Sequence, residues 1–277
     1  MPDPLPCEFT PPNNKDLRSQ MNLINQSIDA NGVATIEINR PEKRNAFDES
    51  VIVELTQAFA EVSESTKARI AVLRGAGPVF CAGGDIHWMR QVAEGDFEQR
   101  HATAELIIKL MYTVYTCPFP TIAAVQGAAF GGGVGLLACC DFAHATKNFK
   151  WATNRGALGV IPACIVPFII ERIGRVKTNQ LLLRAQAMTA DQGLTIGMID
   201  EVHDDAQAMD LRINDFQNEL LQVSPEVQRG TKEFIRAMHS IELASRSSLA
   251  ATTMANSWAS SDCKKDMSAF TTQSPSS

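Results

Sequence analysis

The sequence lacks any segment of the kind that directs secretion or crosses a membrane. Its first six residues, MPDPLP, contain no basic stretch followed by an apolar core, which a secretory signal requires. The apolar run Ile161–Ile170 contains two prolines and is shorter than the about 20 residues that a membrane-spanning helix needs. We therefore expect a cytoplasmic protein that has no membrane partner.

An excess of positive charge is also lacking. The chain has 25 lysine and arginine residues against 31 aspartate and glutamate residues, which gives a formal net charge of −6. Because a nucleic-acid-binding domain normally carries a basic face, we expect no nucleic-acid partner. A polyanionic ligand would instead need a local cluster of cationic side chains.

The seven cysteines form no metal-binding pattern. No two of them have the spacing of zinc ligands, and Cys139 and Cys140 are adjacent within a predicted helix. Small buried thiols in a reducing compartment are the simplest interpretation, so we expect no metal site.

Nucleotide-binding loops are missing as well. No Gly-Lys-Ser/Thr sequence follows a predicted strand, which excludes a P-loop. Residues 133–138 (GVGLLA) loosely match a dinucleotide fingerprint, but the first glycine after the preceding strand is Gly127. No acidic residue ends a neighbouring strand about 20 positions later. We therefore expect no nicotinamide cofactor.

Strand and helix patterns alternate along the chain up to about residue 200. The short apolar runs Ile70–Leu73 and Thr121–Val125 predict buried strands, and apolar spacing after Asp48 and over Ala102–Thr116 predicts helices. Alternation between Asn25 and Arg40 predicts an edge hairpin. A further helix is predicted to begin at the glycine turn of Gly83 and Gly84. Others are predicted over residues 132–140, 167–173, 177–183, 190–195, 206–223 and 225–260, and a strand over 141–145. This order predicts an α/β fold.

Three regions are predicted along the chain. Residues 1–20 are polar and proline-rich, which indicates a flexible N-terminal extension. Residues 21–205 contain the strands and form the predicted core. Residues 206–277 show mainly helical patterns and form a predicted C-terminal helical region.

Two glycine-bearing turns follow predicted strands. The first is residues 80–85 (FCAGGD), and the second is residues 127–135 (GAAFGGGVG). Glycine lets backbone N–H groups approach a ligand closely, and the first N–H groups of a helix have no intrahelical acceptor. If the turns meet in space, two N–H groups converge on one oxygen, as in an oxyanion hole. The sequence therefore predicts a site that stabilises an enolate or a tetrahedral oxyanion.

Four motifs resemble the crotonase (enoyl-CoA hydratase/isomerase) superfamily in their order and spacing. They are residues 39–47 (NRPEKRNAF), 80–86 (FCAGGDI), 124–135 (AVQGAAFGGGVG) and 158–162 (LGVIP). The resemblance runs from about Ser27 to Glu201 and more loosely toward Phe270. Residues 85–89 (DIHWM) and 131–135 (GGGVG) are most similar to the branch that hydrates methylglutaconyl-CoA and isohexenylglutaconyl-CoA thioesters.

This resemblance implies a spiral of ββα units whose C-terminal helices assemble a homotrimer or a dimer of trimers. It implies an acyl-CoA substrate, of which coenzyme A is a part, and an enoyl-CoA hydratase-like lyase that accepts a branched or carboxylated acyl chain. Gly84 and Gly132 match the residues that supply the oxyanion N–H groups, and the helix at Gly132 adds a partial positive charge. The residues implied to border the CoA or acyl group are Arg40, Lys43, Arg44, Ala46, Ala82, Asp85 and Ile86.

Both usual hydratase carboxylates are replaced. Family hydratases use two glutamates that share the nucleophilic water, and the residues here in register with them are Gly135 and Arg155. Arginine is a poor proton shuttle at neutral pH but binds carboxylates through two N–H groups. Three interpretations of Arg155 as a catalytic-site residue stay open. It binds an acidic acyl tail, it supports a decarboxylation, or it marks a chain without hydratase activity.

No other residue is an obvious general base. Glu105 lies on a helix that lines the pocket in relatives, and His87 follows the first turn. His144 in its apolar strand and Cys164 near the expected acyl site fit packing roles better than catalytic ones. The alternatives to hydration are therefore a decarboxylase or an isomerase of the same fold, or a catalytically silent CoA-binding subunit.

Overall fold

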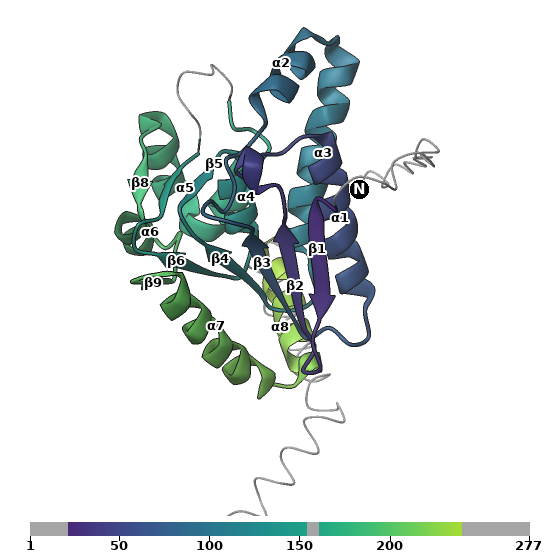
Figure 1. Ribbon diagram of the computed structural model, residues 1–277, viewed down its shortest axis with the longest axis vertical. Coiled ribbons are helices and arrows are strands. Elements are labelled where there is room, and N and C mark those ends of the chain that lie inside the picture. The colour runs from purple at the N-terminus through teal and green to yellow at the C-terminus, as the bar shows by residue number, and fades with distance from the viewer. Residues whose placement is uncertain (1–21, 154–160, 240–277) are drawn as a thin grey trace, which may run out of the picture.

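The computed structural model describes residues 22–153 and 161–239, which form two β-sheets packed with helices (Figure 1). The strands are β1 (Ile24–Ile28), β2 (Val33–Ile38), β3 (Ile70–Gly75), β4 (Thr121–Val125), β5 (Ala128–Phe130), β6 (Phe142–Thr146), β7 (Lys150–Ala152), β8 (Met188–Thr189) and β9 (Glu201–His203). The helices are α1 (Glu49–Glu64), α2 (Ile86–Glu94), α3 (Phe97–Tyr115), α4 (Gly132–Cys139), α5 (Val166–Arg184), α6 (Ala190–Ile196), α7 (Ala206–Leu221) and α8 (Pro225–His239), with a short 3₁₀ helix η1 (Pro41–Lys43). Within these residues, no helix has both the length and the apolar character that crossing a membrane requires.

The larger sheet brings the two glycine turns to one edge. Its strand order is β1-β2-β3-β4-β6-β9. β1 and β2 form an antiparallel hairpin at the end of the sheet, which confirms the predicted hairpin, and the other neighbours pair in parallel. Adjacent parallel strands end at the same edge, so the segments that follow β3 and β4 leave the sheet together. These two segments carry the turns at residues 80–85 and 127–135.

Different helices cover the two faces of the larger sheet. On β3, Ala71 and Leu73 belong to the core that includes residues of α1, α3 and α4, whereas Ile70 and Val72 belong to a second core with α7. Successive side chains of a strand point to opposite faces, so both faces of β3 are buried. Parallel strands buried in this way read as continuous apolar runs, which is why the sequence showed no alternation there.

The longer elements agree with the sequence predictions. β4 has the predicted bounds, and α1 begins directly after Asp48, whose Oδ1 accepts a hydrogen bond from the Val51 N–H at 3.0 Å. Such N-caps typically stabilise a helix by about 0.5–2 kcal/mol. The two helices predicted over residues 167–183 form one element, α5, with a kink at Gly174, where φ is +74°.

Two features differ from the sequence predictions. A second, three-stranded sheet has the order β5-β7-β8, and β9 adds a strand after residue 200, where only helices were predicted. These four strands have only two or three residues, too few to show a period of two. The helix predicted over residues 225–260 is described up to His239, and its remainder lies outside the described residues, as does the predicted extension of residues 1–20.

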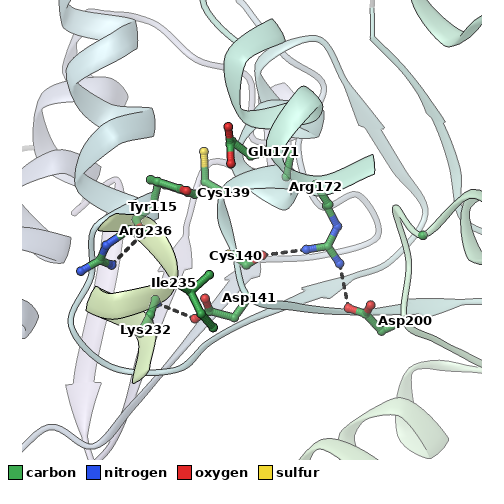
Figure 2. Close-up of a pocket in the computed structure, with 12 residues that line it drawn as sticks. Tyr115, Cys139, Cys140, Asp141, Glu171, Arg172, Asp200, Lys232, Ile235 and Arg236 are labelled. Atoms are coloured by element: carbon green, nitrogen blue, oxygen red, sulfur yellow. Dashed lines mark hydrogen bonds and ion pairs between the residues drawn. The ribbon is translucent and has the colours of Figure 1, made fainter. Parts of the chain in front are cut away.

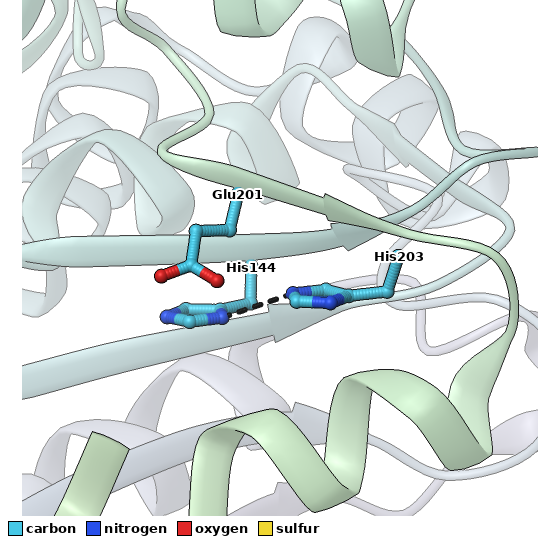
Figure 3. Close-up of side chains that lie close together, drawn as sticks. All are labelled: His144, Glu201 and His203. Atoms are coloured by element: carbon cyan, nitrogen blue, oxygen red, sulfur yellow. Dashed lines mark hydrogen bonds between the residues drawn. The ribbon is translucent and has the colours of Figure 1, made fainter. Parts of the chain in front are cut away.

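The buried His144 on β6 and the half-buried His203 on β9 form an imidazole pair (Figure 3). His144 Nδ1 and His203 Nε2 are 3.1 Å apart, and the ring planes differ by 2°. Glu201 lies beside the pair, and its carboxylate accepts two hydrogen bonds from the Arg212 guanidinium. His144 is 1% exposed, so the sequence prediction of a core histidine with a hydrogen-bond partner is confirmed.

Burial sets the protonation state of this pair. Desolvation lowers the pKa of both imidazoles from the ordinary value of 6.5, and the Glu201 carboxylate opposes that shift only in part. The folded state therefore favours neutral imidazoles, whereas the unfolded chain takes up protons as the pH falls through about 6.5. The stability contributed by the pair is present above that pH and is lost as the pH falls through the lowered folded pKa values.

We predict that the free energy of unfolding decreases from about pH 7.5 to about pH 5.5 and that His203→Gln weakens this dependence. Glutamine keeps an amide that can bond to His144 but does not titrate. Urea unfolding followed by circular dichroism at each pH measures the effect. His101→Gln, whose side chain is 55% exposed in the wild type, is the matched control and should keep the wild-type slope. A wild-type slope in His203→Gln would contradict the prediction.

Candidate active site

Phe47 joins the first glycine turn to the loop before α1. The Phe47 N–H donates to the Gly83 carbonyl at 2.7 Å, and the Asp85 N–H donates to the Phe47 carbonyl at 2.6 Å. This is a parallel bridge between Phe47 and Gly84. In such a bridge, the backbone groups that bond to Phe47 belong to the residues on either side of Gly84, here the Gly83 carbonyl and the Asp85 N–H. The N–H of Gly84 itself therefore points away from Phe47, toward the open side of the turn.

Phe47 also contacts the second turn. A Cβ on Gly132 would lie 2.6 Å from Cε2 of the Phe47 ring, so the ring packs directly against the Gly132 backbone. The segments are also bonded to each other, because the Cys81 N–H donates to the Ala128 carbonyl and the Phe130 N–H donates to the Cys81 carbonyl. The two turns predicted from the sequence to meet in space do lie together.

The geometry leaves two N–H groups without acceptors. Gly132 is the first residue of α4, and the first N–H groups of a helix have no intrahelical partner. No described residue accepts a hydrogen bond from the N–H of Gly84 or of Gly132. Their neighbours Gly83 and Gly131 do donate, to Cys81 Sγ and to the Ala152 carbonyl. Two N–H groups without acceptors on adjoining turns are the components from which an oxyanion hole is built.

Asn45 holds the loop that carries Phe47. Its side chain is fully buried, and its Oδ1 accepts a hydrogen bond from the Arg40 N–H at 2.9 Å. Its Nδ2 donates to the carbonyls of Ala76 and Val79 at 2.9 and 2.7 Å. Asn45 and Phe47 belong to the motif at residues 39–47, from which neither was predicted to have a role at the site. The sequence signal for such a role was an asparagine and a phenylalanine at the end of a loop whose other side chains are mainly charged.

The residues implied to border CoA lie on this loop and on the first turn. Lys43 and Arg44 are exposed, whereas the Arg40 side chain is 15% exposed and contacts the carboxylates of Asp48 and Asp85. The remaining members are Ala46, which is buried, Ala82 and Asp85, which are half-buried, and Ile86, which is 41% exposed at the start of α2. The exposed cations available to a phosphate are therefore Lys43 and Arg44.

The space around Gly135 is filled by apolar side chains. A Cβ on Gly135 would lie 2.4 Å from Ile165 Cγ2 and 3.0 Å from Met111 Sδ. Gly135 and Ile165 are both buried. The position in register with the first family glutamate therefore has no room for a carboxylate. Arg155, in register with the second glutamate, lies outside the described residues.

The other candidates for proton transfer are engaged or distant. Glu105 has a side chain that is 68% exposed and pairs with His101 on the same helix. Asp85 caps α2 by accepting a hydrogen bond from the His87 N–H at 2.9 Å. Burial raises the pKa of the Cys164 thiol, whose Sγ lies 3.8 Å from the Ala104 carbonyl oxygen. A protonated thiol in that contact is consistent with a packing role.

Cys81 belongs to the first turn, is buried, and pairs with Ala129 of the second turn. Burial raises the pKa of its thiol to about 12, although the Gly83 N–H that donates to its sulfur acts in the opposite direction. A Cβ on Gly133 would lie 2.8 Å from the Cys81 carbonyl oxygen. Cys81 is thus a neutral residue that packs the turns together, and it is no nucleophile at neutral pH.

A cavity of about 290 Å³ lies at the opposite end of α4 (Figure 2). Its charged groups already have partners, because Lys232 bonds to Asp141 and Arg172 bonds to Asp200 and to the Cys140 carbonyl. The eight residues of α4 separate this cavity from Gly132 by about 12 Å. The cavity is therefore distinct from the pair of unbonded N–H groups.

Comparison with known proteins agrees with this geometry. The family model described as enoyl-CoA hydratase/isomerase matches residues 29–276. A solved structure described as an enoyl-CoA hydratase from Shewanella pealeana superposes with a TM-score of 0.86 at 30% identity, covering 92% of this chain and 95% of that one. The crotonase-type fold predicted from the sequence is thereby confirmed.

Two curated relatives carry the names of different reactions. A crotonyl-CoA hydratase of Syntrophomonas wolfei is 30% identical over 61% of this chain and 65% of its own length. A mitochondrial Delta(3,5)-Delta(2,4)-dienoyl-CoA isomerase of Mus musculus is 32% identical over 64% of this chain and 57% of its own length. The matched family region, the fold and the joined glycine turns together show that this chain belongs to the enoyl-CoA hydratase/isomerase family.

Proposed function

We propose that this protein processes acyl-CoA thioesters by stabilising a thioester enolate with the N–H groups of Gly84 and Gly132. The observation that carries the proposal is the contact of Phe47 with both turns, each of which carries an N–H group that has no acceptor among the described residues. Fixed donors aimed at a developing oxyanion need no reorganisation during the reaction. The N-terminus of α4 adds a partial positive charge at the same place.

Lys43 and Arg44 complete the substrate site in this proposal. Both are exposed on the loop that leads into Phe47. Cationic side chains there suit the phosphates of CoA, with which they form charge-assisted hydrogen bonds. Coenzyme A then acts as part of the substrate, and no separate cofactor is needed.

The leading reaction is hydration by an enoyl-CoA hydratase-like lyase. The name of the Syntrophomonas relative supports it, and the residues at 85–89 and 131–135 favour a methylglutaconyl-type branch with a branched or carboxylated acyl chain. A cytoplasmic homotrimer or dimer of trimers, assembled through the C-terminal helices, belongs to the same proposal.

A second candidate is a double-bond isomerase or a decarboxylase of the same fold. The packing of Ile165 and Met111 at Gly135 favours it, because a water held between two carboxylates has no place there. Both reactions still pass through an enolate and use the same pair of N–H groups. The name of the mouse isomerase supports the first of them.

One experiment separates these candidates from a silent CoA-binding subunit. Loss of the absorbance of the conjugated thioester reports hydration, and NMR of the products identifies a shifted double bond or released carbon dioxide. Calorimetric binding of CoA is measured on the same sample. CoA binding without turnover of any tested thioester would show a silent subunit and would end the enzyme proposal.

We predict that Gly132→Pro lowers kcat by about 10²–10³ relative to Gly132→Ala. Both variants add a Cβ against the Phe47 ring, but only proline removes the N–H. Proline is tolerated at the first position of a helix, so α4 should remain intact. Steady-state kinetics on the two folded variants measures the difference, and equal kcat values would remove the Gly132 N–H from the mechanism.

We predict that Gly135→Glu lowers the free energy of unfolding by at least about 1–3 kcal/mol, because its side chain enters space occupied by Ile165. The second substitution Ile165→Ala should recover part of that loss. Gly230→Glu on α8, where no atom lies within 4 Å of an added Cβ, is the control and should cost nothing. Urea unfolding gives the values. A Gly135→Glu protein as stable as the wild type would contradict the packing argument.

We predict that Arg155 gives the site a preference for acyl-CoA ligands with a second carboxylate. A guanidinium forms two parallel hydrogen bonds with a carboxylate, which a plain enoyl chain does not offer. Calorimetry compares a glutaconyl-type with a crotonyl-type CoA thioester in the wild type and in Arg155→Met. The preference should disappear in the variant, and equal wild-type affinities would show that Arg155 does not meet the acyl group.

A further inference from the structure

Arg40 lies between the starts of two helices. Its Nη1 is 2.9 Å from Asp48 Oδ2 and 3.5 Å from Asp85 Oδ2, and it donates to the Ala46 carbonyl at 3.1 Å. The three charged side chains are between 12% and 25% exposed, so water screens them only partly. One guanidinium nitrogen thus compensates two carboxylates.

Both carboxylates cap helices. Asp48 accepts from the Val51 N–H at the start of α1, and Asp85 accepts from the His87 and Trp88 N–H groups at the start of α2. Asp85 also follows Gly84 directly and donates its own N–H to Phe47. Arg40 therefore connects the α1 cap to the residue that ends the first glycine turn.

This connection restrains the peptide that carries the Gly84 N–H. The pairing with Phe47 fixes one side of the turn, and the Asp85 side chain, held by Arg40 and by α2, fixes the other. Without Arg40, two partly buried carboxylates would remain close together with no compensating charge. The two negative charges would repel each other, and because Asp85 is part of the first turn, the repulsion would displace that turn.

We propose that Arg40 is a positioning residue of the oxyanion hole, which sets the direction of the Gly84 N–H through Asp85 and does not bind the CoA phosphates. The inference rests on the proposed function of Gly84. The exposed cations Lys43 and Arg44 remain for the phosphates, whereas the Arg40 guanidinium is engaged by three protein oxygens.

The kinetic test compares Arg40→Met with Arg74→Met. Arg74 forms an ion pair with Asp210 of α7, so its loss removes a pair whose side chains make no hydrogen bond to either turn among the described residues. Arg40→Met should lower kcat by about 10- to 100-fold with less than about a threefold change in KM, since small misplacements of a catalytic group have effects of this size. Arg74→Met should leave kcat unchanged. Lys43→Ala should instead raise KM and leave kcat nearly unchanged.

A second measurement does not depend on turnover. Amide hydrogen exchange of the segment 80–89 should speed up in Arg40→Met, because the Asp85 and His87 N–H groups lose a fixed acceptor geometry. It should stay at the wild-type rate in Arg74→Met. Arg40→Lys keeps a positive charge between the carboxylates and should recover part of both the exchange protection and kcat.

The outcomes separate the two proposals. A wild-type protein that turns over no enoyl-CoA thioester would end the proposed function, while the exchange data would still decide whether Arg40 orders the turn. A raised KM with unchanged kcat in Arg40→Met would overturn the positioning role and assign Arg40 to the CoA phosphates. Unchanged exchange over residues 80–89 in that variant would overturn it too.

Discussion

The site depends on the contact of Phe47 with both glycine turns. Its backbone pairs with the Gly83–Asp85 turn, and its ring occupies the space that a side chain on Gly132 would need. A flexible pair of glycine turns would lose conformational entropy on meeting an oxyanion, whereas a pair that is already bonded to one buried residue does not. The buried amide of Asn45 in turn fixes the loop that carries Phe47. The preceding loop therefore adds rigidity to the turns, which are also bonded to each other through Cys81.

The sheet explains why these segments meet at all. β3 and β4 are parallel neighbours, so their carboxyl ends lie at one edge, where ligands commonly bind in α/β proteins. Between the turns, every second backbone group is used in a bridge, as the bonds of Cys81 with Ala128 and Phe130 show. The N–H of Gly84 is left without an acceptor among the described residues. Two unbonded N–H groups are thus a consequence of strand geometry and of one helix start, and they need no special side chain.

The sequence could predict those elements that local residue patterns determine, and it could not predict those that depend on contacts between distant segments. β4 and the start of α4 are marked by a continuous apolar run and by consecutive glycines, and both were predicted at the observed positions. β5, β7 and β8 are too short to show a pattern, and they exist because distant segments pair. The same difference holds at the site. Gly84 and Gly132 were predicted from local glycine patterns and a family resemblance, whereas the joining role of Phe47 and the two carboxylates around Arg40 depend on tertiary contacts. The family resemblance had placed Arg40 among the residues that border CoA.

The pair of N–H groups does not decide the reaction, because hydration, isomerisation and decarboxylation of a thioester all need the same oxyanion stabilised. The decision lies with the groups that hold water or move a proton. At Gly135, which the family resemblance aligns with a glutamate, Ile165 and Met111 fill the volume that a carboxylate side chain would need. Buried apolar contacts of this kind also stabilise the fold, so they resist removal. A single substitution to glutamate would have to displace them before it could hold a water molecule. The divergence of this chain from a two-glutamate hydratase is therefore a property of its core as well as of its active-site residues.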